Sequence, residues 1–111
     1  MNSSTYYPQI QKIADAYGYS SQSRKCIGKT EKLRQAIDEY YRDRDSEYAN
    51  KYPFYPPDEY LPNDFTSYDN LIEGIADMQI MLWQMAYLLN ANVKPIIEQK
   101  LNEQLERIVK E

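Results

Sequence analysis

The side chains available for chemistry are limited, because the 111 residues include no histidine and only one cysteine, Cys26. Without histidine, the chain has no Ser-His-Asp or Cys-His catalytic arrangement, no imidazole general base and no zinc site that contains histidine. A single cysteine excludes an intramolecular disulfide and a cysteine cluster for zinc or iron–sulfur. Carboxylates, lysine, arginine, tyrosine and backbone groups therefore remain for catalysis or binding.

Charge and hydrophobicity narrow the possible partners. The net charge of −4 argues against direct binding to nucleic acid or to anionic lipid as the main activity. No run of about 18 apolar residues occurs, and the opening MNSSTYYPQI lacks the apolar region of a signal peptide. We therefore expect a soluble, cytoplasmic protein that does not contact a membrane. The length fits one domain over residues 1–111.

Scarce glycine and the spacing of apolar residues predict an all-α fold with four main helices. The first runs from about Tyr7 to Tyr17 and ends at Gly18, and the second, from about Ser21 to Asp43, is amphipathic. The third, from about Asp69 to Asn90, becomes apolar around most of its circumference, which predicts burial or a dimer interface. The fourth, from about Val93 to Lys110, has a narrow apolar seam formed by Val93, Ile97, Leu101, Leu105 and Ile108.

Residues 42–69, between the second and third helices, form a long segment rich in tyrosine, proline and acids. It holds four of the six prolines, and its seven acids outnumber its three bases, whereas the rest of the chain has ten of each. Such a long loop is unusual in a small helical domain, and its aromatic residues argue against simple disorder. We interpret it as an extended arm packed on the helices, either as a surface for a protein partner or as a lid over the core. The candidate partner-binding residues are Tyr48, Tyr52, Phe54, Tyr55 and Tyr60.

About half of the chain lies in three segments with a common resemblance: YGYSSQSRKCIGKTEKLRQAI (Tyr17–Ile37), NLIEGIADMQIMLWQMAYLL (Asn70–Leu89) and IIEQKLNEQLERI (Ile96–Ile108). In this order they resemble the MazG-type all-α nucleoside triphosphate pyrophosphohydrolases, whose members typically read E-E-I-A-D in the second segment. The resemblance implies a four-helix MazG-like bundle that forms a homodimer or tetramer, with residues 42–69 as an insert. In the family, an E-x-x-E pair and an E-x-x-D pair hold Mg²⁺, which activates the water that cleaves the triphosphate.

This sequence departs from the family at those carboxylates. Aligned without gaps, Lys29 and Lys32 occupy the two positions of E-x-x-E. Gly74 replaces the glutamate of the second motif, while Asp77 is retained and Glu73 precedes the motif. One carboxylate facing two ammonium groups does not form a Mg²⁺ site, because hard cations need several oxygen ligands and positive charges repel them. We therefore expect a non-catalytic member without metal or cofactor, with an active Mg²⁺-dependent pyrophosphohydrolase as an alternative.

The main hypothesis is a protein that binds or sequesters a phosphorylated, nucleotide-type ligand, since a lysine ammonium can contact a phosphate oxygen directly. The candidate ligand-binding residues are Arg24, Lys25, Lys29, Lys32, Glu73, Asp77, Trp83 and Lys100. Because small proteins resembling this family are common in bacteriophages, one form of the hypothesis is a phage sponge for a nucleotide signal in the host cytoplasm. Two alternatives stay open: an inhibitor or adaptor that binds a host protein through residues 42–69, and lysines that are only solvated or paired with a carboxylate.

Overall fold

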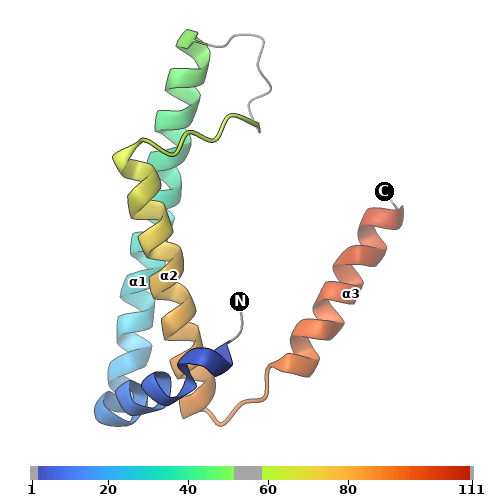
Figure 1. Cartoon of the computed structure of the whole chain (residues 1–111). Coiled ribbons are helices and arrows are strands. Elements are labelled where there is room, and N and C mark those ends of the chain that lie inside the picture. Colours follow the sequence, from blue (N-terminus) through green and yellow to red (C-terminus); the bar gives the residue numbers. More distant parts are fainter. Residues whose placement is uncertain (1–2, 52–58, 111) are drawn as a thin grey trace.

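The computed structural model describes residues 3–51 and 59–110, and these residues form helices and connections without any strand. A short 3-10 helix, η1 (Ser3–Tyr6), is followed by α1 (Tyr7–Lys51), α2 (Thr66–Leu88) and α3 (Lys94–Lys110) (Figure 1). The all-α prediction is confirmed. The described residues thus contain three α-helical elements, and α1 includes the first two of the four predicted helices, which meet at a kink at Gly18.

Helix α1 bends sharply at Gly18, where φ is 81° and ψ is 170°. A residue with a Cβ rarely adopts this backbone conformation, so glycine at this position allows the bend. The segments before and after Gly18 run in different directions (Figure 1). The predicted interruption at Gly18 is therefore correct, although the extended ψ differs from the left-handed helical cap that the sequence suggests.

The long second part of α1 packs antiparallel to α2 as a helical hairpin (Figure 1). Contacts along its length follow an antiparallel register, in which the residue number rises on α1 as it falls on α2: Gln22 contacts Gln84, Lys29 contacts Asp77, and Tyr40 contacts Tyr68. The apolar residues buried in the described structure are few, namely Ile10, Ala14, Ala36, Tyr40 and Met81. The hairpin thus has a small core, and its register determines which polar side chains face one another.

The predicted arm is shorter than residues 42–69, because α1 continues to Lys51 and α2 begins at Thr66. The helix can continue past Asp43 since no glycine or proline occurs before Pro53. The described end of the arm packs on the hairpin: the Tyr40 hydroxyl donates to the Pro62 carbonyl oxygen at 3.0 Å, and the Tyr40 ring contacts Phe65.

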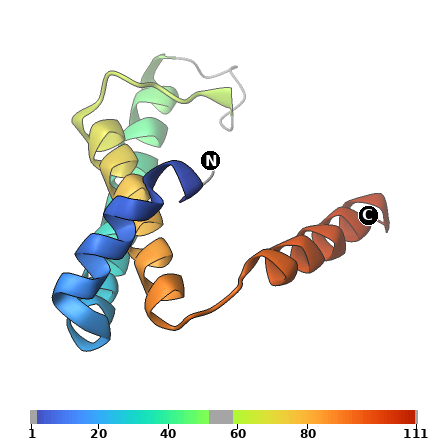
Figure 2. The same ribbon diagram turned by 60° about the horizontal axis from the view of Figure 1, so that its bottom comes forward.

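Helix α3 does not complete a four-helix bundle within the chain, and none of its residues is buried. It leads away from the α1–α2 hairpin in both views (Figures 1 and 2). The direction is set at the end of α2, where Asn90 has a φ of 52°. The N–H of Asn90 donates to Tyr87 O at 3.0 Å and that of Ala91 to Ala86 O at 2.9 Å, the pattern of a Schellman cap. The predicted bundle of four helices is therefore not confirmed.

Two tyrosines are expected to make the folded chain less stable at alkaline pH. Burial raises the pKa of Tyr40, and the hydrogen bond that Tyr87 donates to Asp15 raises the pKa of Tyr87. Because the pKa of each tyrosine is higher in the folded chain than in the unfolded chain, the neutral phenol stabilises the fold. This stabilisation is complete below the unfolded pKa of about 10, and it is lost as the pH rises through the pKa of the folded chain. The free energy of unfolding, measured with urea, is expected to fall between pH 8 and pH 10.5. This fall is expected to be smaller for Tyr40→Phe/Tyr87→Phe than for the native chain. An equal loss would contradict this assignment.

Candidate functional site

A groove of about 360 Å³ lies on one side of the α1–α2 hairpin and is lined mainly by polar side chains. We call it the polar groove. Helix α1 contributes Lys29, Lys32, Gln35 and Glu39. Helix α2 contributes Asn70, Glu73 and Asp77. The structure thus brings together four of the residues that the sequence singled out, two lysines from one helix and two carboxylates from the other.

Lys29 and Asp77 form an ion pair across the polar groove. The Lys29 Nζ donates to Asp77 Oδ2 at 3.1 Å, and the two side chains are 30% and 44% exposed. A pair with this much solvent contributes at most about 1 kcal/mol to stability. Its larger effect is on chemistry, because the Asp77 carboxylate already holds an ammonium group and is less available to a cation.

The charges in the polar groove are mixed. Lys29 and Lys32 share it with the carboxylates of Glu39, Glu73 and Asp77, and the amides of Gln35 and Asn70 add donors and acceptors. In the described part of the chain no ion pair involves Lys32, whose side chain is exposed. The groove therefore offers one engaged ammonium, one solvated ammonium and several acceptors.

Gly74 lies beside the polar groove, where α2 packs closely against Leu33 of α1. A Cβ at Gly74 would lie 3.2 Å from Leu33 Cδ1 and 3.6 Å from Leu33 Cα. A side chain at position 74 therefore requires Leu33 to move. Close packing against Leu33 favours glycine at position 74.

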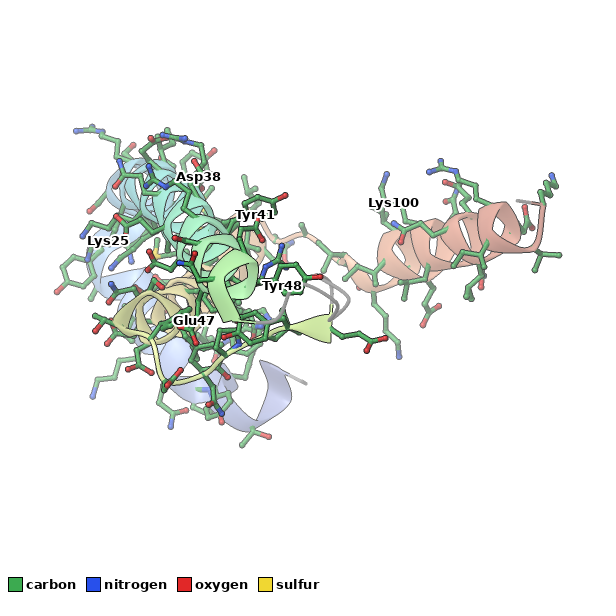
Figure 3. The ribbon with its side chains drawn as sticks, turned by 90° about the horizontal axis from the view of Figure 1, so that it is seen from above. Lys25, Asp38, Tyr41, Glu47, Tyr48 and Lys100 are labelled. Atoms are coloured by element: carbon green, nitrogen blue, oxygen red, sulfur yellow. The ribbon has the colours of Figure 1, made fainter. Side chains whose placement is uncertain are left out.

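The other four predicted ligand residues do not line the polar groove. Arg24 is exposed on α1, and the Lys25 ammonium lies 5.2 Å from the centroid of the Tyr17 ring. Trp83 stacks with Tyr6, with the ring centroids 6.0 Å apart. Lys100 is on α3, far from Lys25 (Figure 3). These residues do not form one site with the groove lysines.

The predicted partner surface is described only in part. The rings of Tyr48 and Tyr60 have centroids 6.0 Å apart, and the Tyr60 hydroxyl donates to Glu47 Oε1 at 2.5 Å. Glu47 and Tyr48 lie near the end of α1 (Figure 3). Tyr52, Phe54 and Tyr55 lie outside the described residues. The described part thus joins the arm to α1 through an aromatic contact and a hydrogen bond.

Sequence reasoning missed three polar lining residues of the polar groove, and it missed a second groove. Gln35, Glu39 and Asn70 are in the polar groove, and the helical spacing from Lys32 could have found the first two. The second groove, of about 430 Å³, lies between the start of α1 and α2. We call it the apolar groove, and its lining includes Ile10, Ile13, Ile72, Ile75, Ile80 and Trp83.

Over residues 3–51 and 59–110, no group of three or more histidine, cysteine, aspartate or glutamate side chains is placed to hold a metal ion. No helix in these ranges combines the length and the apolar character needed to cross a bilayer.

Comparison with known protein families, with curated proteins and with solved structures finds no match. A function must therefore be argued from the grooves themselves.

Proposed function

We propose that the protein binds a phosphorylated, nucleotide-type ligand in the polar groove without hydrolysing it. The observation that carries the proposal is the placement of Lys29 and Lys32 beside amide and carboxylate acceptors in one groove. The two lysines are three residues apart on α1, so their side chains share a face of that helix. Both can approach the same anionic group.

The mixed charges favour a nucleotide over a simple anion. The three carboxylates of the groove repel an anion that has no hydrogen-bond donors of its own. A nucleotide carries its phosphate at one end and hydroxyl and amino donors at the other. Its phosphate can contact Lys29 and Lys32. Its donors can satisfy acceptors such as Glu39 and Glu73.

The absence of turnover in this proposal rests on Asp77. If the chain derives from MazG-type pyrophosphohydrolases, Asp77 is the retained metal ligand, and Lys29 holds it at 3.1 Å. An ammonium at that distance competes with a cation for the carboxylate. Lysines then supply directly the positive charge that Mg²⁺ supplies in the family. Such a protein would sequester a nucleotide signal in the cytoplasm rather than degrade it.

Thermal unfolding against a panel of nucleoside phosphates, cyclic dinucleotides and ADP-ribose tests the proposal. A ligand present at 100 times its Kd adds about 2.7 kcal/mol, which raises the Tm of a domain of this size by roughly 10 °C. The shift is expected with or without Mg²⁺ and without release of pyrophosphate. In Lys29→Ala/Lys32→Ala the shift is expected to disappear.

The matched control is Lys25→Ala/Lys100→Ala, which removes two lysines that lie outside the polar groove. This control is expected to keep the full ligand shift. Loss of the Lys29–Asp77 pair costs at most about 1 kcal/mol, so the groove variant is expected to fold. No shift with any ligand, or a shift that survives in Lys29→Ala/Lys32→Ala, would refute the proposal.

A further inference from the structure

Helix α3 carries an apolar stripe that stays exposed in the described part of the chain. The stripe consists of Ile97, Leu101, Leu105 and Ile108, whose spacing places them on one face. These four side chains are 50–68% exposed. Most of the stability of an amphipathic helix in a protein comes from packing its apolar face, so α3 is expected to need a partner surface.

The apolar groove is a surface of matching character and length. Ile13, Ile72, Ile75 and Ile80 in its lining are 40–46% exposed. Its α2 wall runs from Ile72 to Trp83, and the α3 stripe runs from Ile97 to Ile108, so each is about 16 Å long at 1.5 Å per residue. The α3 stripe can therefore fill the apolar groove along its length.

The chain exposes more surface than a compact monomer of its size, and this excess is available for an interface. The accessible surface is 8,697 Å², whereas a compact monomer of 13.2 kDa exposes about 6,400 Å². The radius of gyration is 17.8 Å, whereas about 13 Å is typical of a compact chain of this length. Covering the excess in two copies buries more than about 2,000 Å², the range of obligate homodimers.

We infer that two copies of the chain exchange α3, so that the stripe of each copy packs in the apolar groove of the other. The Schellman cap at Asn90 directs α3 away from α2 and from the start of α1 (Figure 2), the two elements that line the apolar groove. Helix α3 carries four basic and three acidic residues, unlike the strongly basic face of helices that bind anionic membranes. A reciprocal contact of this kind closes as a symmetric dimer.

Sedimentation of the full chain tests the exchange. The native chain is expected to have the mass of two copies, and Leu101→Glu/Leu105→Glu and Ile75→Glu are each expected to have the mass of one. The matched control Gln99→Glu/Asn102→Glu adds the same charge to α3 outside the stripe and is expected to remain dimeric. Circular dichroism establishes that each variant is still helical. A monomeric native chain, or a dimer that survives Ile75→Glu, overturns the inference.

Cross-linking provides a second test that needs no disruptive substitution. In a Cys26→Ser background, chains with Leu101→Cys are mixed with differently tagged chains with Ile75→Cys and treated with a long bismaleimide. A cross-link between the two kinds of chain is expected. In a chain that carries both Leu101→Cys and Ile75→Cys, a cross-link that forms only within one chain overturns the inference. A native chain that is monomeric and binds phosphatidylserine vesicles also overturns it. Lys29→Ala/Lys32→Ala is expected to remain dimeric, so failure here is distinguishable from failure of ligand binding.

Discussion

Replacement of Gly18 by alanine is expected to lower the free energy of unfolding by about 1–3 kcal/mol. The φ of 81° and ψ of 170° at Gly18 lie in a region that is nearly exclusive to glycine. A Cβ there would meet no atom within 4 Å. The expected cost is therefore the strain of the backbone itself, and no repacking of neighbours can relieve it.

Alanine at position 18 instead favours a straight continuation of α1. A straight helix would carry Tyr6 and Asp15 away from their partners Trp83 and Tyr87. Since Trp83 is the only tryptophan in the sequence, its fluorescence reports the loss of this contact. Urea unfolding at a fixed chain concentration gives the change in free energy.

Gly28→Ala is the matched control, because Gly28 is helical and a Cβ there also meets no atom within 4 Å. The same chemical change at this position is expected to raise stability by about 0.5–1 kcal/mol, since alanine restricts the unfolded chain. Opposite signs at the two glycines are the expected result. Stabilisation at both positions would mean that the bend at Gly18 is not needed for the fold.

The sequence predicted the helical elements because their signals are local. Apolar spacing within one helix and the glycine at position 18 do not depend on distant residues. The end of α1 and the position of α3 were predicted less well. No glycine or proline lies between Asp43 and Pro53, so no local signal ends α1 at Asp43. The amphipathic pattern of α3 specifies an apolar face but does not determine whether the same chain covers it.

Only half of the predicted ligand-binding residues line the polar groove, because their positions depend on contacts between helices as well as on local signals. Lys29 and Asp77 meet because the antiparallel register places them opposite each other. Trp83 is six residues beyond Asp77, about 240° around α2, so it faces away from the polar groove. Lys25 shares a face with Lys29, yet its ammonium lies over the Tyr17 ring, a cation–π contact that depends on the bend at Gly18. The position of each residue around its helix and the bend at Gly18 determine which side chains lie in the groove, whereas residue type alone does not.

Gln22→Leu and Gln84→Leu are each expected to destabilise the chain by about 1–3 kcal/mol. The two side chains are only 1% and 2% exposed, and Gln22 Nε2 donates to Gln84 Oε1 at 2.5 Å. Either single substitution leaves a buried amide without its partner, and the full desolvation penalty of that amide then opposes folding. Exposed Gln99, which donates to Glu103 at 3.3 Å, gives a matched control: Gln99→Leu is expected to change stability by about 0.5 kcal/mol or less.

The double variant Gln22→Leu/Gln84→Leu is expected to be nearly as stable as the native chain. It removes both buried amides, including Gln22 Oε1, which has no hydrogen-bond partner in the described structure. A double-mutant cycle from urea unfolding measures the coupling between the two positions. If the double variant is stable, the buried pair is not needed for stability, and its value lies in fixing the register that sets Lys29 opposite Asp77. That variant should then lose part of the ligand-induced shift in Tm. If it is instead less stable than either single variant, the amide pair contributes net stability and this explanation of its presence is wrong.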